Sequence, residues 1–260
     1  MKKVAIVTGG SSGIGKCTAE RLNDDYTVYE FSRSGKERED IRHLDCDVTE
    51  TEDIIKAVNK VIADTGRVDL VVNCAGFGIS GAIEYTDLDD AKRQFDVNFF
   101  GLAEVNRICI PYLKKTKGRI INISSVAALA AIPFQAYYSA CKAAVNSYTL
   151  ALANELKPFG VSVCAIMPGD TSTGFTKARN KNIKGDGEYG GRISKSVEKM
   201  ENDERKGVDA DVVGRLICAI AKKKKIKPIY TVGWDYKLII CLLKILPYNL
   251  SNYLIAKLYG

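Results

Sequence analysis

The segment from Thr8 to Gly15 (TGGSSGIG) constrains the fold of this 260-residue chain more than any other feature. It follows a short apolar run and opens a helical stretch. In this setting Gly9 permits a tight turn, Gly13 lets the backbone approach a pyrophosphate, and Gly15 lets the helix pack on the strand. The free N–H groups of the helix N-terminus then face the phosphates. The pattern indicates a dinucleotide-binding loop; a glycine-rich turn without a ligand is the alternative.

Apolar runs alternate with helical stretches along the chain, which is the pattern of βαβ units and a parallel sheet. The candidate strands are 3–8, 26–32, 41–45, 68–73, 118–124, 161–167 and 228–231, and the candidate helices are 13–24, 50–65, 88–114, 134–156 and 209–221. The length fits one domain with a large core. The sequence therefore predicts an α/β fold over residues 1–260, a single-domain, Rossmann-like, doubly wound parallel sheet with a C-terminal amphipathic helical extension.

Tyr138 and Lys142 lie four residues apart, so they share one face of a helix. An ammonium beside a phenol favours the phenolate and lowers the pKa of the tyrosine. Such a pair donates and accepts protons in the carbon–oxygen chemistry of an alcohol or a ketone. The spacing alone occurs by chance in many helices. Here Ser125 lies thirteen residues upstream of Tyr138, and the glycine-rich loop opens the chain.

Together these motifs resemble the short-chain dehydrogenase/reductase family over roughly residues 3 to 176, and more weakly to the end. The resemblance implies a catalytic set of Asn98, Ser125, Tyr138 and Lys142. Tyr138 would give the proton, and Lys142 would lower its pKa and hydrogen-bond the nicotinamide ribose. Ser125 would hold the carbonyl oxygen, and Asn98 would hold a water that links Lys142 to solvent. A domain that binds nucleotide but has lost catalysis is the alternative.

Two neighbours compete for these roles. Tyr137 adjoins Tyr138, but it points about 100° away around the helix. Ser124 adjoins Ser125, and strand alternation aims the two side chains in opposite directions. The thirteen-residue spacing to Tyr138 favours Ser125.

The resemblance also implies which residues contact the coenzyme. They are Gly9, Ser11, Ser12, Gly13, Ile14 and Gly15 in the loop; Ser32, Arg33 and Ser34 after the second strand; Asp47 and Val48 beside the adenine; Asn73, Ala75 and Gly76 after the fourth strand; Tyr138 and Lys142; and Pro168, Gly169, Thr171 and Thr173 near the nicotinamide carboxamide. Cys74 stands where the family usually has Asn, and we interpret it as a packing residue.

The end of the second strand indicates the coenzyme. An acidic residue there would bind the ribose 2′-OH and repel a 2′-phosphate. The usual acidic position is Ser32, and Arg33 follows it. A guanidinium can pair with a 2′-phosphate through two hydrogen bonds. The sequence therefore favours NADP(H) over NAD(H), although Glu30 would compete if the strand ended two residues earlier.

The composition of the chain limits the classes of protein to which it can belong. Eight Cys are scattered without a C-x-x-C pair, which favours reduced thiols in a cytoplasmic protein and predicts no metal site. Residues 177–260 hold 18 basic and 9 acidic residues, a net +9, whereas residues 1–130 carry a net −2. A solvated surface explains this asymmetry most simply. A basic face for an acidic partner or anionic lipid headgroups is the alternative. Nothing indicates nucleic-acid binding.

Two segments outside the motifs are distinctive. Residues 177–207 show little apolar periodicity and follow a strand end, so we expect a substrate lid within 170–207; a surface insertion is the alternative. Residues 234–260 form an apolar extension whose runs are too short to span a bilayer. We expect short amphipathic helices that wall the substrate cleft or help to pair subunits, with their apolar faces covered by another subunit or by the body of the chain. Peripheral attachment to a membrane is the alternative.

The expected function is NADP(H)-dependent interconversion of a secondary alcohol and a ketone, on a small apolar substrate such as a hydroxysteroid. A 3-oxoacyl-thioester (acyl carrier protein) reductase is an alternative, and a non-catalytic NADP-binding sensor or scaffold is an alternative of another class. We also expect a homodimer or homotetramer formed through 88–114 and 134–156, which carry Phe95, Phe99, Leu102 and Val105.

Overall fold

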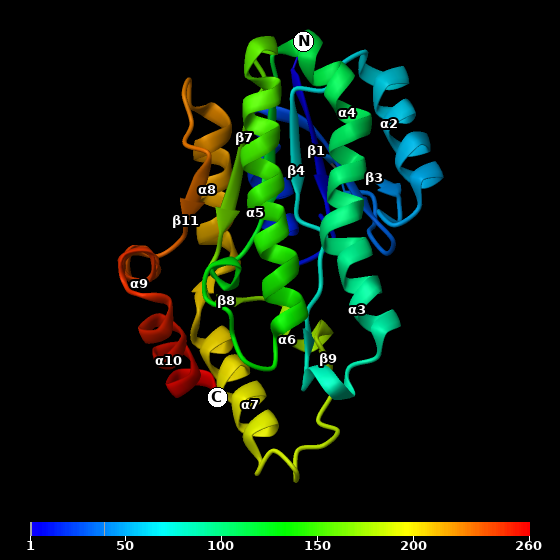
Figure 1. The fold of residues 1–260 in the computed structure, drawn as a ribbon. Helices are drawn as coiled ribbons and strands as arrows, with labels where there is room; N and C mark the ends of the chain where they lie inside the picture. The colour runs from blue at the N-terminus through cyan, green and yellow to red at the C-terminus, as the bar shows by residue number, and fades with distance from the viewer. Residues whose placement is uncertain (1, 39) are drawn as a thin grey trace.

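The fold is built on a seven-stranded parallel sheet, seen in a computed structural model that describes residues 2–38 and 40–260 (Figure 1). The strand order is β11-β7-β6-β4-β1-β2-β3. The strands are β1 (Lys3–Thr8), β2 (Tyr26–Ser32), β3 (Ile41–Asp45), β4 (Leu70–Asn73), β6 (Arg119–Ile123), β7 (Ser162–Met167) and β11 (Ile229–Thr231). The chain runs outward from β1 to β3 and then returns to β4 on the other side of β1. This reversal leaves a crevice at the carboxyl ends of β1 and β4, where ligands bind in such sheets.

Helices cover both faces of the sheet, which gives the doubly wound arrangement expected. One face carries α2 (Thr51–Thr65), α4 (Leu102–Thr116) and α5 (Ala136–Leu156), whose apolar residues share a core cluster with β1 and β4. The opposite face carries α1 (Gly13–Leu22) and α8 (Ala210–Lys222). Central strands are apolar on both sides because both faces are covered; Val4 to Val7 of β1 are at most 1% exposed.

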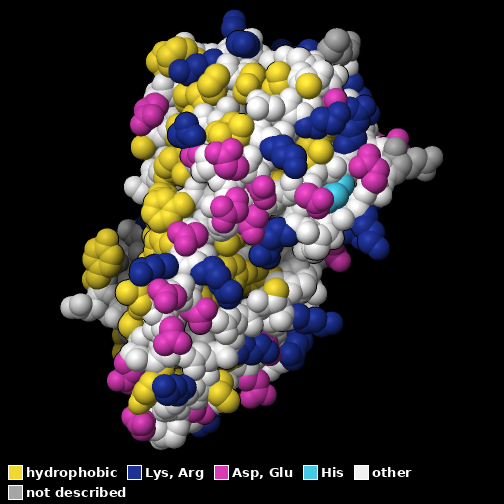
Figure 2. All heavy atoms as spheres, turned by 90° about the vertical axis from the view of Figure 1, so that its right-hand side faces the viewer, with side chains coloured by type: hydrophobic (Ala, Val, Ile, Leu, Met, Phe, Trp, Pro, Cys, Tyr) yellow, Lys and Arg dark blue, Asp and Glu magenta, His cyan; other side chains and the backbone are white. Residues whose placement is uncertain are grey.

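The surface at the β3 edge is mixed in charge. Figure 2 shows basic and acidic side chains interspersed over this side of the molecule. This agrees with the near-neutral balance of the N-terminal half.

The helix expected at 88–114 is divided into three parts. It comprises α3 (Leu88–Phe95), a π-helical turn at Asp96–Gly101, and α4. π-Helical turns are rare and often mark functional sites. Asn98 lies in this turn with its side chain fully buried.

The segment 177–207 is more ordered than its sequence indicates. It contains α7 (Arg192–Lys206), which buries Ile193, Val197 and Met200 in a small cluster with Ala82. These residues recur at intervals of four and three, a helical face hidden among charges. The expectation of little apolar periodicity is therefore wrong for this part.

Short elements tie the segment to the body of the protein. Two small parallel pairs, β8 (Thr171–Ser172) with β10 (Val208–Asp209) and β5 (Ile79–Ser80) with β9 (Asn180–Lys181), hold it, together with α6 (Phe175–Ala178). Movement of this segment as a lid remains a prediction.

The C-terminal extension forms two short helices, as expected. These are α9 (Trp234–Ile245) and α10 (Tyr248–Tyr259), which follow one another at one edge of the molecule, where α10 contacts α7 (Figure 1). Many of their apolar side chains are exposed: Trp234, Leu238, Ile239, Leu242, Ile245, Tyr248, Leu250, Tyr253, Leu254 and Leu258. The body of the same chain therefore does not cover these side chains, so that part of the expectation is wrong. Among the described residues, no helix is long and apolar enough to cross a membrane.

Candidate active site

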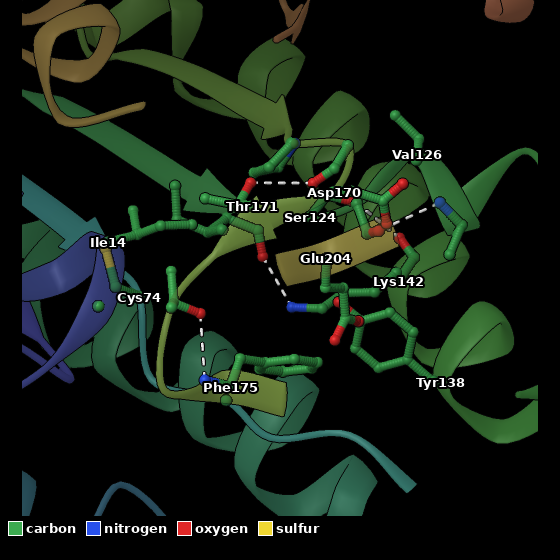
Figure 3. A pocket seen from close by; sticks show the side chains of 18 of the residues that line it. Ile14, Cys74, Ser124, Val126, Tyr138, Lys142, Asp170, Thr171, Phe175 and Glu204 are labelled. Carbon is green, nitrogen blue, oxygen red and sulfur yellow. Dashed lines mark hydrogen bonds between the residues drawn. The ribbon is translucent and has the colours of Figure 1, made fainter. Parts of the chain in front are cut away.

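A cavity of about 380 Å³ opens at the carboxyl ends of β1, β4, β6 and β7 (Figure 3). The glycine-rich loop forms one wall, and Ser125, Tyr138 and Lys142 lie on another. Residues far along the chain complete it, including Glu204 of α7 and Tyr259 of α10. The topological crevice and the motif residues therefore coincide.

The glycine-rich loop has no room for side chains. A Cβ on Gly15 would lie 2.2 Å from the carbonyl oxygen of Gly9, and one on Gly9 would lie 2.9 Å from the Ala75 backbone. Gly9 also has φ +65°, a left-handed conformation that favours glycine. The Thr8 hydroxyl accepts hydrogen bonds from the backbone N–H groups of Cys74 and Ala75, both at 3.1 Å. These contacts fix the loop after β1 against the loop after β4. The backbones of the two loops form one surface of the cavity, which we call the glycine cradle.

Tyr138 and Lys142 point into the cavity from α5. The Lys142 Nζ donates to the carbonyl oxygen of Ile123 at 2.9 Å and lies 5.7 Å from the centre of the Tyr138 ring. Ser125 caps a short helical turn and accepts the Ala127 N–H at 3.1 Å, and its side chain lies close enough to Tyr138 to lower the pKa of the phenol. The Ser124 hydroxyl is instead used on the Lys142 carbonyl at 3.1 Å. Ser125 is therefore the serine that faces the phenol, as its spacing predicts.

Burial decides the protonation state of Tyr138. Loss of solvent raises the pKa of Tyr138 to about 12, while the nearby Ser125 side chain lowers it by a smaller amount. Burial also lowers the pKa of Lys142. The expected lowering of the Tyr138 pKa is not seen in the net shift, because burial outweighs the groups that lower it, Ser125 and Arg179. The effect of Lys142 on this pKa stays a prediction. The phenol is protonated at neutral pH, the form that can donate a proton.

A model of the short chain dehydrogenase family matches residues 3–184. The chain belongs to this family. It is 39% identical over 227 residues to a 3-ketodihydrosphingosine reductase of Bacteroides thetaiotaomicron, covering 85% of this chain and 84% of that protein. A short-chain dehydrogenase from Streptomyces avermitilis has the same fold, with a TM-score of 0.85, 26% identity and coverage of 99% and 97%. The structure of ElxO with NADP bound gives a TM-score of 0.75 at 27% identity, covering 92% and 100%.

The residues expected to contact the coenzyme fall into two groups in this short-chain dehydrogenase. The cavity is lined by the expected residues Gly9, Ser12, Gly13, Ile14, Gly15, Ala75, Gly76, Ser125, Tyr138, Lys142, Pro168, Gly169, Thr171 and Thr173. It is not lined by Ser11, Ser32, Arg33, Ser34, Asp47, Val48, Asn73 or Asn98. Most residues of the second group belong to the expected adenosine end.

Two asparagines of the predicted site have structural partners instead. The Asn98 Oδ1 accepts the Phe77 N–H at 2.9 Å, and its Nδ2 donates to the Phe77 carbonyl at 2.8 Å. Asn73 donates to Asn106 and Asn122 at 2.8 and 2.9 Å in the core. The structure therefore brings neither side chain into contact with Lys142 or the cavity. The positions of these residues along the chain predict that they lie near the site, but they do not predict the direction of the side chains.

Cys74 lines the cavity wall and behaves as a packing residue. A Cβ on Gly15 would lie 3.2 Å from the Cys74 Cβ, so the thiol side chain packs directly on the loop. Burial raises its pKa to about 12, which keeps the thiol protonated and unreactive. This agrees with the sequence-based interpretation.

The end of β2 falls at Ser32, as expected. Glu30 is fully buried, and its Oε1 is 2.5 Å from the His43 Nδ1 and 3.3 Å from the Ser32 hydroxyl. Glu30 therefore presents no carboxylate at the surface. Arg33 is 76% exposed at the side chain and lies 3.6 Å from Asp47, free to turn toward a ligand.

Sequence reasoning missed four groups near the site. Arg38 donates to the Gly10 carbonyl of the loop at 3.0 Å. Asp170, Glu204 and Tyr259 line the cavity, and Asp170 accepts a hydrogen bond from the Tyr236 hydroxyl. Asp170 directly follows the predicted Gly169, so the sequence could have indicated it as a site residue. The others come from distant helices that no local spacing connects to the motif.

The raised pKa of Tyr138 is directly measurable. At a pH of about 10, where an unperturbed tyrosine is half ionised, Tyr138 should remain protonated because burial disfavours the phenolate. Tyrosinate absorbance of the wild type and of Tyr138→Phe should then be equal at this pH. If the variant absorbs less than the wild type by the amount expected for half a tyrosinate, Tyr138 titrates normally and the prediction is wrong. Free N-acetyltyrosinamide at the same pH is the reference that gives the absorbance of half a tyrosinate.

Proposed function

We propose that this protein is an NADP(H)-dependent reductase that converts the ketone of an apolar lipid to a secondary alcohol, and catalyses the reverse reaction. The observation that carries the proposal is the placing of a protonated Tyr138 beside Ser125 and Lys142 in one cavity. Donors aimed at one point stabilise the charge that develops on a carbonyl oxygen. The cavity floor is the glycine cradle, so a nucleotide and a carbonyl compound would meet there.

The chain's residues fit a nicotinamide coenzyme. The backbone cradle between Gly9, Gly15 and Ala75 would be filled by any Cβ, which suits a pyrophosphate that must approach the backbone. Lys142 offers an ammonium at the expected ribose position. A bound nicotinamide supplies the hydride for such a reaction.

The protein's own groups would then manage the oxygen and its proton. Ser125 donates a hydrogen bond to the substrate oxygen, and Tyr138 gives its phenolic proton as the alcohol forms. The Lys142 ammonium lies behind the ring and stabilises the phenolate until solvent returns a proton. Asn98 braces the π-helical turn through Phe77.

Charge at the adenosine end supports NADP(H). Arg33 is exposed, Arg38 lies against the loop at Gly10, and Glu30 is enclosed by His43 and Ser32. Arg33 is therefore the guanidinium available to a 2′-phosphate, whereas Arg38 is held by Glu20 and by the Gly10 carbonyl. The NADP bound to ElxO is in line with this proposal.

An apolar lipid fits the outer part of the cavity. Ile132, Phe175 and Met200 line it, and the Phe175 and Tyr138 ring centres are 5.7 Å apart. The name of the Bacteroides relative, a reductase of 3-ketodihydrosphingosine, also favours a long-chain ketone. A hydroxysteroid and a 3-oxoacyl thioester are the competing substrates to compare.

We expect Tyr138→Phe to lose turnover by roughly 10²–10⁴-fold while still binding NADPH, because it lacks only the transferable proton. The measurement is NADPH oxidation with a long-chain ketone, a ketosteroid and an acetoacetyl thioester. Tyr137→Phe is the matched control and should remain active. Near-normal turnover in Tyr138→Phe would refute the assignment, and NADPH binding without turnover by the wild type on any ketone would favour a sensor or scaffold.

Replacing Arg33 with Ala should weaken NADPH binding on the order of tenfold, since a charged hydrogen bond to the 2′-phosphate is lost from an exposed position. NADH binding should barely change. Titration of both coenzymes by fluorescence measures this, with exposed Lys56→Ala as the control. A wild type that prefers NADH would contradict the choice of coenzyme.

The assembly is a further part of this proposal. Leu102 and Val105 are buried within the subunit, so they cannot form the expected interface, but Phe100 is 58% exposed beside α4. We expect the wild type to sediment as a dimer or tetramer at micromolar concentration and Phe100→Glu to dissociate it, because a charge would enter an apolar contact. A wild-type monomer would refute this assembly. Binding of that monomer to liposomes, lost on truncation before Trp234, would favour membrane attachment of α9 and α10.

A further inference from the structure

The outer end of the cavity is acidic. Asp170, Asp203 and Glu204 lie close enough for the charges of the last two to raise the pKa of Asp170. Two of the three carboxylates have cationic partners. Glu204 pairs with Arg179, whose side chain is fully buried, and Asp203 pairs with Lys199 at 2.9 Å.

Asp170 is the carboxylate of this group without a countercharge. It makes no ion pair within the part of the chain that the structure describes, and its side chain accepts a hydrogen bond from the Tyr236 phenol. The Tyr236 ring leaves no space for a side chain on Gly169, where a Cβ would lie 2.1 Å from the ring. Helix α9 thereby holds Asp170 in place on the cavity wall (Figure 3).

The cavity itself contains no cation that would neutralise Asp170. Among the described lining residues the one basic side chain is Lys142, which is held by the Ile123 carbonyl and belongs to the catalytic group. A half-buried carboxylate without a countercharge is costly unless a ligand supplies one. Burial is the main cause of the raised pKa of Asp170, and the Lys199 ammonium, which pairs with Asp203, lowers that pKa less than the two neighbouring carboxylates raise it.

A second polar group on the wall also lacks a protein partner. Gln135 is 6% exposed and lines the same cavity, yet its side-chain amide makes no hydrogen bond to any described residue. It directly precedes α5, three residues before Tyr138, which lines the same cavity. A buried amide without a partner indicates a polar substituent on the ligand near the carbonyl.

We propose that Asp170 binds a cationic amino group of the substrate, with Gln135 as a neighbouring polar contact, so that the preferred substrate is an amino ketone. This inference rests on the proposed reductase function. The ammonium would supply the missing countercharge through a charge-assisted hydrogen bond. The apolar remainder of the substrate would lie along Phe175 and Met200 toward the C-terminal helices.

The test compares three long-chain ketones of equal length with NADPH as the coenzyme. One carries an amino group beside the carbonyl, one carries the same nitrogen as a neutral N-acetyl group, and one lacks the nitrogen. The wild type should prefer the amine, and Asp170→Asn should lower the ratio of kcat/KM for the amine to that for the plain ketone roughly 10- to 100-fold, the value of a charged hydrogen bond. The change should fall mainly on KM. Asp203→Asn, whose carboxylate does not line the cavity, should keep the wild-type ratio.

The outcomes separate the inference from the function on which it rests. If the wild type reduces the plain ketone as well as the amine, the inference is wrong and the reductase function stands. A preference for the amine that persists in Asp170→Asn also overturns it. If the wild type reduces none of the three ketones, the proposed function itself fails. The wild-type comparison decides the preference even if Asp170→Asn does not fold.

Discussion

The close contact of backbone with backbone at the start of the chain is the constraint on which the site depends. Gly9 and Gly15 lie against each other and against Ala75 at distances that exclude any side chain. This contact exists because β1 and β4 are neighbours at the point where the strand order reverses. The loops after β6 and β7 reach the same edge of the sheet. One packing arrangement therefore forms the coenzyme cradle and brings the catalytic residues beside it.

Burial then determines the chemistry of this site. Lys142 is buried and Tyr138 is partly buried, and desolvation shifts the pKa of each toward the neutral form. A protonated phenol suits reduction of a carbonyl, whereas an alcohol substrate would need the phenolate. The C-terminal helices contribute to the same enclosure, since Tyr259 lines the cavity and Tyr236 covers Gly169. Their exposed apolar faces are available for contacts with a second subunit or a lipid surface.

The sequence predicts the features that depend on local pattern. The seven strands of the central sheet were found within two residues, because most of them are continuous apolar runs. The four short strands β5, β8, β9 and β10 were not predicted. Ser125, Tyr138 and Lys142 were found because a turn of helix and a fixed spacing place them together. Helix α7 was not found because charged residues conceal its three-residue apolar face. Asp170, Glu204 and Tyr259 meet only through tertiary packing, and the orientation of Asn73 and Asn98 depends on partners far away in the sequence.

The central claim is that a hydride passes from NADPH to a ketone in this cavity. The direct measurement is reduction of a long-chain ketone with NADPH that carries deuterium on the transferring carbon of nicotinamide, followed by mass spectrometry of the product. We predict one deuterium on the new carbinol carbon from one of the two deuterated epimers, and none from the other, because the cradle fixes one face of the ring. Oxidation of NADPH without deuterium in an alcohol product, or no oxidation at all with the ketone, would contradict the account.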